Sequence, residues 1–278
     1  MAAGVRTKRV AKSVSPRQAP ATVIHLYGLT EAQGQTSQLP SQLPSELSRN
    51  LTGVDGVARI ESIACGGLTC WISRVPEAEF AQNLAKNMQD LDWLASVTMR
   101  HQQVISAIAE AADILPARFG IEFLNDESLR YHIAGRQSVL KADLDRIRGK
   151  EEWGVKVFGL PIMAAAPKKK IRSGKEYLRA KSALTRRVTD RANAELQEFA
   201  KALQSIADNI AEGGKFASTS RDLAFHKTIL LKRAKRKRLE SLIRNYSKKW
   251  KNKKRIECTG PWPPFSFVSG PESGRNDG

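Results

Sequence analysis

The sequence predicts an α+β protein with two domains, each with helices on one face of an antiparallel or mixed sheet. The chain has 278 residues, more than one hydrophobic core comfortably holds, so two domains are expected. In both halves, some segments have apolar residues at alternate positions, as in strands, and others have them at the spacing of a helix. Segments of each kind are grouped together along the chain. With 41% apolar and 27% charged residues, most of the chain is expected to be globular.

The domain limits follow from changes in composition. We expect the N-terminal domain over residues 22–161 and the C-terminal domain over residues 173–268, joined by an Ala- and Lys-rich linker over 162–172. Residues 1–21 and 269–278 are expected to be disordered tails. The first tail carries several cations, no acid and no periodicity, so an organellar transit peptide is the alternative interpretation.

The N-terminal domain is expected to begin with a strand over 22–28, a β-rich run that ends in glycine. A polar loop should follow over 31–53, where the unit Gln-Leu-Pro-Ser occurs twice in tandem; four-residue units bury nothing, so this is not a repeat architecture. Residues 56–75 are expected to form a hairpin, because Gly66 and Gly67 suit a two-residue turn.

This turn sets the register of the hairpin. Ile63 is expected opposite Cys70, and Cys65 opposite Leu68, which makes the two cysteines diagonal neighbours on one face. Three cysteines in a chain of this length do not form a disulfide framework. We therefore expect Cys65 and Cys70 to be reduced and to pack as small hydrophobic residues.

A helix is predicted over residues 90–114, after Pro76 has ended the sheet. His101 lies close to its apolar stripe and is expected to be a lone, half-buried, hydrogen-bonded residue rather than a metal ligand. Pro116 then stops the helix, and Gly120 permits a turn; Arg118 lies between apolar neighbours and either forms an internal ion pair or contacts a partner. The predicted stripe comprises Leu91, Leu94, Ala95, Thr98, Ile105, Ile108, Ala109 and Ala112.

A more polar helical region is expected over 126–149, with Asn125 or Asp126 as its cap and Gly149 at its end. A strand over 151–158 follows, with Trp153, Val155 and Val157 on one face.

The C-terminal domain is expected to begin with a long amphipathic helix over 174–212, ended by Gly213 and Gly214. A strand over 223–231 should come next, then a helix over 232–255. The order of elements is compatible with a ferredoxin-like arrangement. The stripe of the long helix comprises Leu184, Val188, Ala192, Leu196, Phe199, Leu203, Ile206 and Ile210.

The helix over 232–255 has two contrasting faces. Its apolar stripe comprises Leu239, Leu242, Ile243, Tyr246 and Trp250, whereas the other face is rich in Lys and Arg, with Glu240 as its acid. Three interpretations remain open for the region from Lys232 to Arg255: a face exposed to solvent, a binding site for an acidic protein surface, or a surface that follows nucleic-acid phosphates.

The C-terminal run over 259–268 contains Pro261, Pro263 and Pro264, which exclude a helix or a central strand. Beyond it, Phe265 and Phe267 alternate with polar and small residues, as in a short edge strand. Trp262 and the two phenylalanines must be buried or offered to a partner, since each hides about 150–250 Å² when packed. The run is therefore expected to be either a clamp over a seam of the core or a docking surface.

Signatures of catalysis and of cofactor binding do not occur in the sequence. There is no phosphate-binding loop, no dinucleotide-binding fingerprint, and no cysteine or histidine spacing that suits zinc. The acids Glu151, Glu152, Asp143 and Asp145 are expected to be solvated surface residues. We therefore assign no catalytic, cofactor-binding or metal-binding residue, and we expect no cofactor and no enzymatic activity.

The formal net charge of +18 predicts attraction to anionic surfaces. No apolar run approaches the length that spans a bilayer, and the basic N-terminus lacks the apolar segment of a secretory signal. A soluble intracellular protein is expected.

Seven short segments occur in a characteristic order along the chain: 25–28, 75–80, 90–95, 114–120, 151–157, 173–178 and 259–268. With these segments, the chain resembles the GvpL/GvpF family of gas vesicle accessory proteins. The resemblance implies a two-domain α+β protein with a modified ferredoxin-like C-terminal domain. It also implies a minor component or assembly factor of cytoplasmic gas vesicles that binds the small, hydrophobic shell protein and other accessory proteins.

The resulting hypothesis is a gas vesicle assembly factor that limits aggregation of the shell protein. The alternative is a nucleic-acid-associated basic protein that uses the helix over 232–255. The candidate partner-binding residues are Arg118, Phe119, Gly120, Trp153, Gly260, Pro261, Trp262, Pro263, Pro264 and Phe265.

Overall fold

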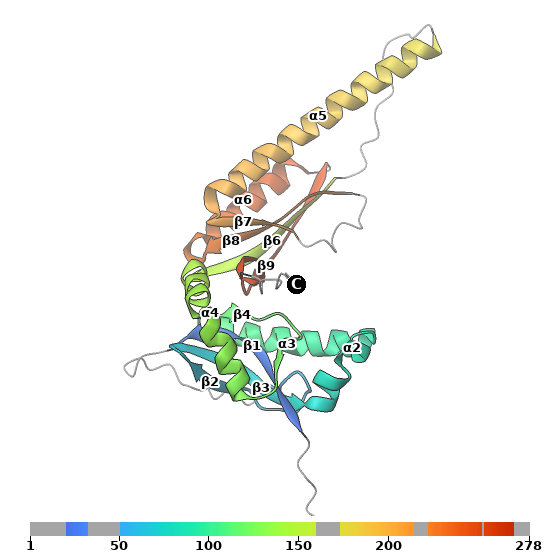
Figure 1. Ribbon diagram of the computed structural model, residues 1–278. Coiled ribbons are helices and arrows are strands. Elements are labelled where there is room, and N and C mark those ends of the chain that lie inside the picture. The colour runs from blue at the N-terminus through green and yellow to red at the C-terminus, as the bar shows by residue number, and fades with distance from the viewer. Residues whose placement is uncertain (1–20, 33–50, 160–172, 214–221, 252, 270–278) are drawn as a thin grey trace, which may run out of the picture.

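The computed structural model describes residues 21–32, 51–159, 173–213, 222–251 and 253–269. They form two antiparallel sheets with helices, which confirms the α+β class (Figure 1). The tandem Gln-Leu-Pro-Ser units, the linker over 162–172 and nearly all of the two predicted tails lie outside the described residues.

The first sheet, sheet A, is centred on β1 (Thr22–Glu31), which is longer than predicted. β1 pairs with β3 (Leu68–Pro76) on one side, and with β4 (Leu115–Pro116) and β5 (Glu122–Phe123) on the other. β2 (Glu61–Cys65) forms the outer strand and the predicted hairpin with β3. The register is as expected, with Ile63 opposite Cys70 and Cys65 opposite Leu68, and both cysteines are free and buried.

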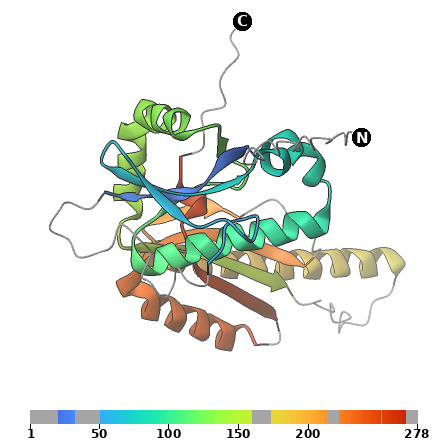
Figure 2. The ribbon, with the colours of Figure 1, turned by 90° about the horizontal axis from the view of Figure 1, so that it is seen from below.

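Helices cover both faces of sheet A, whereas we expected helices on one face only. α3 (Leu91–Ala111) packs on the side of Val23 and Tyr27, and α4 (Asp126–Ile147) packs on the side of Ile24 and Leu26. Figure 2 shows the two helices on opposite sides of the strands. The physical reason is that β1 is apolar at successive positions, as in a strand that is buried on both faces.

The buried stripe of α3 differs from the predicted one. The helix begins after the cap Asp90, as expected, but Leu91 and Met99 are exposed. The predicted residues Leu91, Leu94, Ala95 and Thr98 lie on or beside the exposed side of the helix. The stripe that packs on the sheet comprises Val97, His101, Val104, Ile105 and Ile108.

Two short helical segments precede α3, and the predicted helix α4 follows it. A π-helical turn η1 (Ala78–Gln82) and α2 (Leu84–Asn87) connect sheet A to α3. α4 begins with the capping box of Asn125 and Ser128, and Gly149 follows it with a positive φ of 66°. Both ends of this helix agree with the sequence prediction.

The second sheet, sheet B, has the strand order β7-β8-β6-β9. Its strands are β6 (Lys150–Gly159), β7 (Asn209–Glu212), β8 (Leu223–Lys232) and β9 (Lys254–Trp262). With its two helices, the order of elements along the chain is β-α-β-β-α-β. We expected the strand over 151–158 in the N-terminal domain, whereas β6 pairs with β8 and β9.

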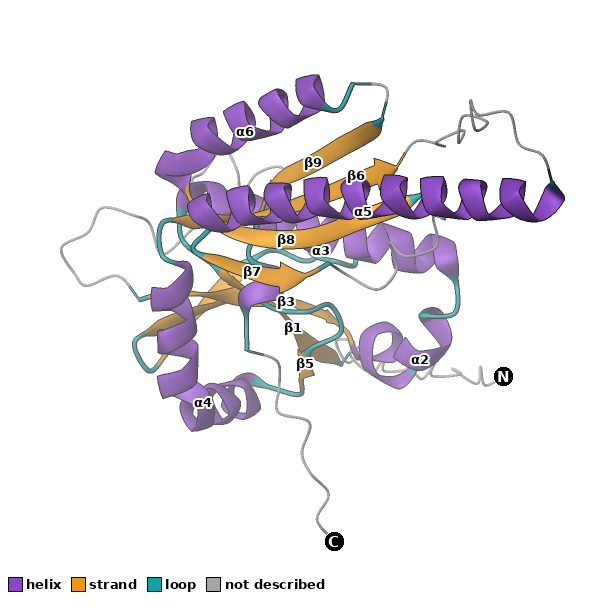
Figure 3. Cartoon of the chain, turned by 90° about the horizontal axis from the view of Figure 1, so that it is seen from above, coloured by secondary structure: helices purple, strands orange, loops and turns teal. Residues whose placement is uncertain are grey.

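α5 (Gly174–Ile206) and α6 (Arg236–Lys249) cover the same face of sheet B (Figure 3). Their buried residues pack against Trp153, Val155 and Val157 of β6, the strand face that the alternation predicted. The other face of sheet B carries Leu230, which belongs to the core beneath α4. The two sheets therefore share part of one core.

The long helix ends earlier than predicted. It stops at Ile206, and Ile210 lies in β7 instead of on the helix stripe, so Gly213 does not end the helix. Its N-terminal part extends beyond sheet B in Figures 1 and 3. We call residues 174–193 the arm; at 1.5 Å per residue it is about 30 Å long.

The packing of Phe199 leads to a first prediction. Its ring is fully buried and lies 4.9 Å from that of Tyr246 and 5.2 Å from that of Trp250, measured between centroids. Phe199→Ala should lower the free energy of unfolding by about 3–5 kcal/mol, because it leaves a cavity in the core of sheet B. Urea unfolding measures this change. Leu178→Ala, at a side chain that is 67% exposed on the arm, should change it by less than about 0.5 kcal/mol.

Candidate partner-binding cleft

The C-terminal segment runs along sheet B and then across the seam between the two sheets. β9 is an edge strand beside β6, which agrees with the exclusion of Pro261 from a central strand. At Gly260, φ is 143°, and a Cβ atom would lie 2.9 Å from the Glu152 carbonyl oxygen and 2.9 Å from the Trp153 ring. Glycine therefore lets the strand approach Trp153 closely.

After β9, the segment turns into the short 3₁₀ helix η4 (Phe265–Phe267), where we had predicted a short edge strand. Pro263 and Pro264 are buried, and the ring of Phe267 enters the core between sheet A and α4. Residues two positions apart in a 3₁₀ helix point to different sides, so Phe267 packs in the core with α4 and Phe265 packs against the core with α3. The segment is a clamp in this sense, as the sequence suggested.

Two buried carboxylates hold the clamp. The backbone N–H and the hydroxyl of Ser266 both donate to Glu152, each at 2.8 Å. The N–H and the hydroxyl of Ser269 donate to Asp143, at 2.8 and 2.9 Å. Burial raises the pKa of Glu152, and the bonds from Ser266 oppose that shift. Glu152 and Asp143 are thus buried structural groups, and the prediction that they are solvated was wrong, although Asp145 is exposed.

The clamp closes one side of a cleft of about 360 Å³ between the two sheets. Trp262 lines the cleft and remains 45% exposed. The opposite wall is the C-terminal half of α3. The cleft is lined by Ser106, Ala109, Glu110, Ala112, Asp113, Ile114, Ile147, Lys150, Glu151, Arg233, Arg236, Pro261, Trp262, Pro263 and Pro264.

Most charges of the cleft are neutralised within the chain. Arg236 donates to both oxygens of Glu151, at 3.0 and 2.6 Å, and the Trp153 indole N–H donates to the same carboxylate. The hydrogen bonds that Arg236 donates to Glu151 raise the pKa of Arg236. Arg233 pairs with Asp113 at 2.8 Å. Glu151 was also expected to be solvated, but it is buried, and its charge is compensated by the ion pair with Arg236.

The other candidate residues lie apart from the cleft. Arg118 is exposed beside a hollow of about 70 Å³ that Phe265 also lines. Phe119 is half-buried against the core between sheet A and α3. Gly120 has a φ of 88° and serves the turn. The structure therefore groups Pro261 to Pro264 at the cleft, with Trp153 and Gly260 behind them, and separates the segment 118–120.

His101 is neither lone nor half-buried, contrary to prediction. Its Nε2 lies 3.0 Å from the carbonyl oxygen of Ala117, which can only accept, so Nε2 carries the proton. Its Nδ1 then accepts from Nε2 of His25, at 2.9 Å, and His25 Nδ1 lies 2.8 Å from Glu122. Burial, the larger cause, and the nearby His25 lower the pKa of His101 to about 4.

This chain of hydrogen bonds joins α3 to sheet A and was missed because its members are far apart in sequence. Within the described residues, no group of three or more His, Cys, Asp or Glu side chains could hold a metal ion. In the same part of the chain, no helix is long and apolar enough to cross a bilayer.

Comparison with known proteins identifies relatives of the whole chain. The family model described as gas vesicle synthesis protein GvpL/GvpF matches residues 23–269. Gas vesicle protein L of a Streptomyces strain is 28% identical over 218 residues, which cover 73% of this chain and 80% of that protein. Gas vesicle protein F1 of Halobacterium salinarum is 23% identical over 245 residues, 88% of this chain and 92% of that protein.

Two crystal structures have the same fold. The gas vesicle protein GvpF from Anabaena has a TM-score of 0.65 at 18% identity, over 90% of this chain and 97% of that one. GvpF from Microcystis aeruginosa has a TM-score of 0.64 at 17% identity, over 89% and 99% of the two chains.

The lowered pKa of His101 predicts a pH dependence of stability. The unfolded chain binds a proton at this residue below its ordinary pKa of 6.5, whereas the folded chain does so only below about 4. The free energy of unfolding should therefore fall as the pH falls from 6.5 to 4, by about 3 kcal/mol in all. His101→Asn keeps an acceptor for His25 and should flatten this slope in urea unfolding at several pH values. Burial and Arg136 also lower the pKa of His132, but this side chain is exposed, so His132→Asn should flatten the slope much less. Identical slopes for wild type and His101→Asn would contradict the assignment.

The clamp predicts that Gly260→Ala destabilises the protein by about 1–3 kcal/mol, because of its φ and its close contacts. Gly135→Ala is the matched control: nothing lies within 4 Å of the place that an added Cβ would take on this helical glycine, so alanine should be neutral or stabilising. Chemical unfolding measures the free energy of unfolding of each variant. If Gly260→Ala is as stable as Gly135→Ala, the close approach of the strand to Trp153 is contradicted.

Proposed function

This chain belongs to the GvpL/GvpF family of gas vesicle synthesis proteins, and from that premise we propose that it assists gas vesicle assembly by binding an apolar segment of the shell protein. The observation that carries the proposal is a strip on α3 that is apolar from Leu91 to Met99 and continues through Gln102 and Ser106 to the cleft beside Trp262. The proposed role is that of a non-enzymatic accessory protein, active at gas vesicles in the cytoplasm.

The strip begins at the N-terminal end of α3. Leu91 is 77% exposed and Met99 is 61% exposed, and Ala95 lies between them. Residues three and four positions apart share one face of a helix, so this face continues through Gln102 and Ser106 to Ala109. We call these six residues the α3 strip. Exposed apolar surface of this kind is typical of a protein–protein contact.

The α3 strip and the cleft form a continuous surface, since Ser106 and Ala109 also line the cleft. Trp262 stands at the far wall, where a half-exposed indole can cover an apolar side chain of a partner. Because Arg233 and Arg236 are already paired with Asp113 and Glu151, the cleft does not require a charged ligand.

A surface with one exposed helix face and one aromatic wall suits an amphipathic helix of the partner. Shell subunits are the partner that family membership favours. Covering their apolar segments before they join the wall would slow their aggregation. Other accessory proteins of the vesicle could be recruited by the same chain through surfaces outside the cleft.

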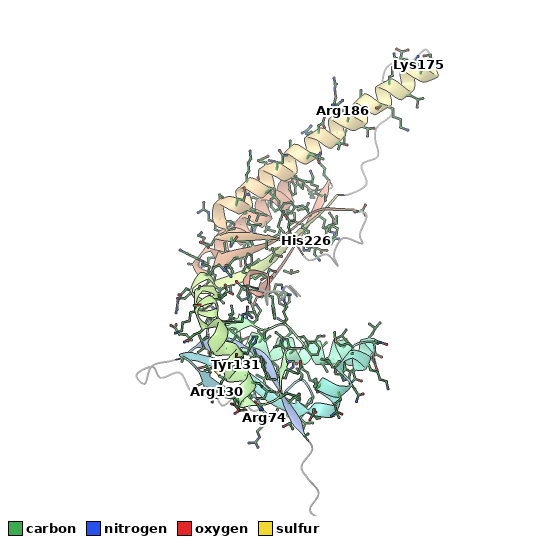
Figure 4. All side chains as sticks on the ribbon, viewed as in Figure 1. Arg74, Arg130, Tyr131, Lys175, Arg186 and His226 are labelled. Carbon is green, nitrogen blue, oxygen red and sulfur yellow. The ribbon has the colours of Figure 1, made fainter. Side chains whose placement is uncertain are left out.

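Trp262→Ala and Met99→Glu should each weaken binding of the shell protein about tenfold or more, because the first removes an aromatic anchor and the second places a charge in an apolar contact. Co-expression with the shell protein, followed by co-purification and measurement of the soluble shell fraction, tests both variants. Tyr131→Ala is the matched control, since Tyr131 is 84% exposed on α4 (Figure 4) and should leave binding unchanged.

Two outcomes would contradict the proposal. If the soluble fraction of the shell protein is the same with and without this chain, the protection from aggregation is wrong. If Tyr131→Ala weakens binding as much as Trp262→Ala does, the cleft is not the binding site.

A further inference from the structure

The outermost face of α6 carries a row of cations. Leu239, Tyr246 and Trp250 pack toward sheet B, so the side chains on the opposite side of the helix point away from the protein. These positions are Lys237, Ser241, Arg244 and Lys248; Lys251 follows just after the helix, and all five residues are exposed. We call Lys237, Arg244, Lys248 and Lys251 the basic row.

Three cations beside the basic row are neutralised by ion pairs, whereas the members of the row are not. Lys249 pairs with Glu198 of α5 at 2.9 Å, and Lys235 pairs with Asp208 at 3.5 Å. On the side of the cleft, Arg236 pairs with Glu151. Within the described part of the chain, no carboxylate forms an ion pair with any member of the row.

Within α6, only Glu240, four residues before Arg244, offsets the repulsion among the cations of the row. Arg244 and Lys248 are spaced i,i+4, where like charges repel each other. Lys237 lies in the first turn, which has no acidic residue, and cations are unfavourable at that end of the helix dipole. A ligand that brings negative charge to this face would therefore relieve repulsion within the protein as well as form ion pairs.

We propose that the basic row binds the acidic face of a helix from a partner protein. From Lys237 to Lys248 the row extends about 17 Å along the helix axis, and Lys251 follows just after the last residue of α6. A helix with acids at positions i, i+4 and i+7 repeats the spacing between Arg244 and Lys248 and that between Lys237 and Arg244. This surface lies on the helix-covered face of sheet B, so the inference does not depend on the α3 strip or on the shell protein.

The surroundings of the row favour a ligand as narrow as a helix. Glu240 lies on α6 toward the side of Cys258 and Arg236, and Glu198 lies on the α5 side. A nucleic acid duplex carries phosphates on two strands across a wider surface and would meet these carboxylates. No aromatic ring of α6 stands on the row to stack with bases, because Tyr246 and Trp250 pack against Phe199.

The test measures fluorescence anisotropy with two labelled probes at about 0.15 M salt. One probe is a helical peptide of about 21 residues with glutamates at i, i+4 and i+7, and the other is a random duplex of about 20 base pairs. Wild-type protein should bind the peptide. The triple variant Lys237→Glu, Arg244→Glu and Lys248→Glu should weaken that binding at least about tenfold, since each attraction becomes a repulsion.

The control makes the same charge change on the arm of α5, with Lys175→Glu, Arg179→Glu and Arg186→Glu. Figure 4 shows Lys175 and Arg186 on this part of the helix, far from α6. The control should bind the peptide nearly as well as wild type. All six side chains are exposed, and circular dichroism verifies that both variants fold.

Three results would overturn the proposal. The first is no binding of the peptide by wild-type protein. The second is an equal loss in both triple variants, which would mean that only net charge matters. The third is tighter binding of the duplex than of the peptide, lost through the same row, which would assign the row to nucleic acid.

Discussion

Ser266 and Ser269 each direct an N–H and a hydroxyl at a buried carboxylate, one in sheet B and one on the helix that covers sheet A. A buried carboxylate without hydrogen bonds is strongly unfavourable, so both acids favour this placement of the C-terminal segment, although Arg146 also pairs with Asp143. That placement brings the Phe267 ring into the first core and leaves Trp262 at the cleft. The same four hydrogen bonds thus support both the joint between the two sheets and the candidate binding site, together with Arg146, which donates to Asp143 and to the carbonyl oxygen of Phe267.

Local patterns in the sequence predicted the elements that local physics determines. The register of the hairpin follows from Gly66 and Gly67, and the faces of β6 and α6 follow from simple alternation and helical period. The errors concern interactions over long distances in the chain. The α3 stripe was misplaced because its buried face contains His101, whose polar ring is satisfied by His25, 76 residues away. No feature of residues 90–114 alone reveals that partner.

The same limit applies to the site. The proline run indicated a clamp, and the structure places it across the seam, but Glu152 and Asp143 resembled surface acids because their serine partners are more than 110 residues distant. The exposed face of α3 could have been noticed as a second apolar stripe, since Leu91, Ala95 and Met99 are spaced by four. Leu91 and Ala95 were instead assigned to the core stripe, because sequence periodicity identifies a face without indicating what covers it.

The central position of β1 has a consequence for how the protein is made. This strand is synthesised before all of its pairing partners, which reach from residue 68 to residue 123, and β9 and the clamp follow the other described strands. During translation, β1 therefore has no paired strand until β3 has been made, and sheet B stays unfinished until residues 254–262 have been made. A truncated product that ends before residue 254 would keep sheet A but leave the edge of β6 open to other chains.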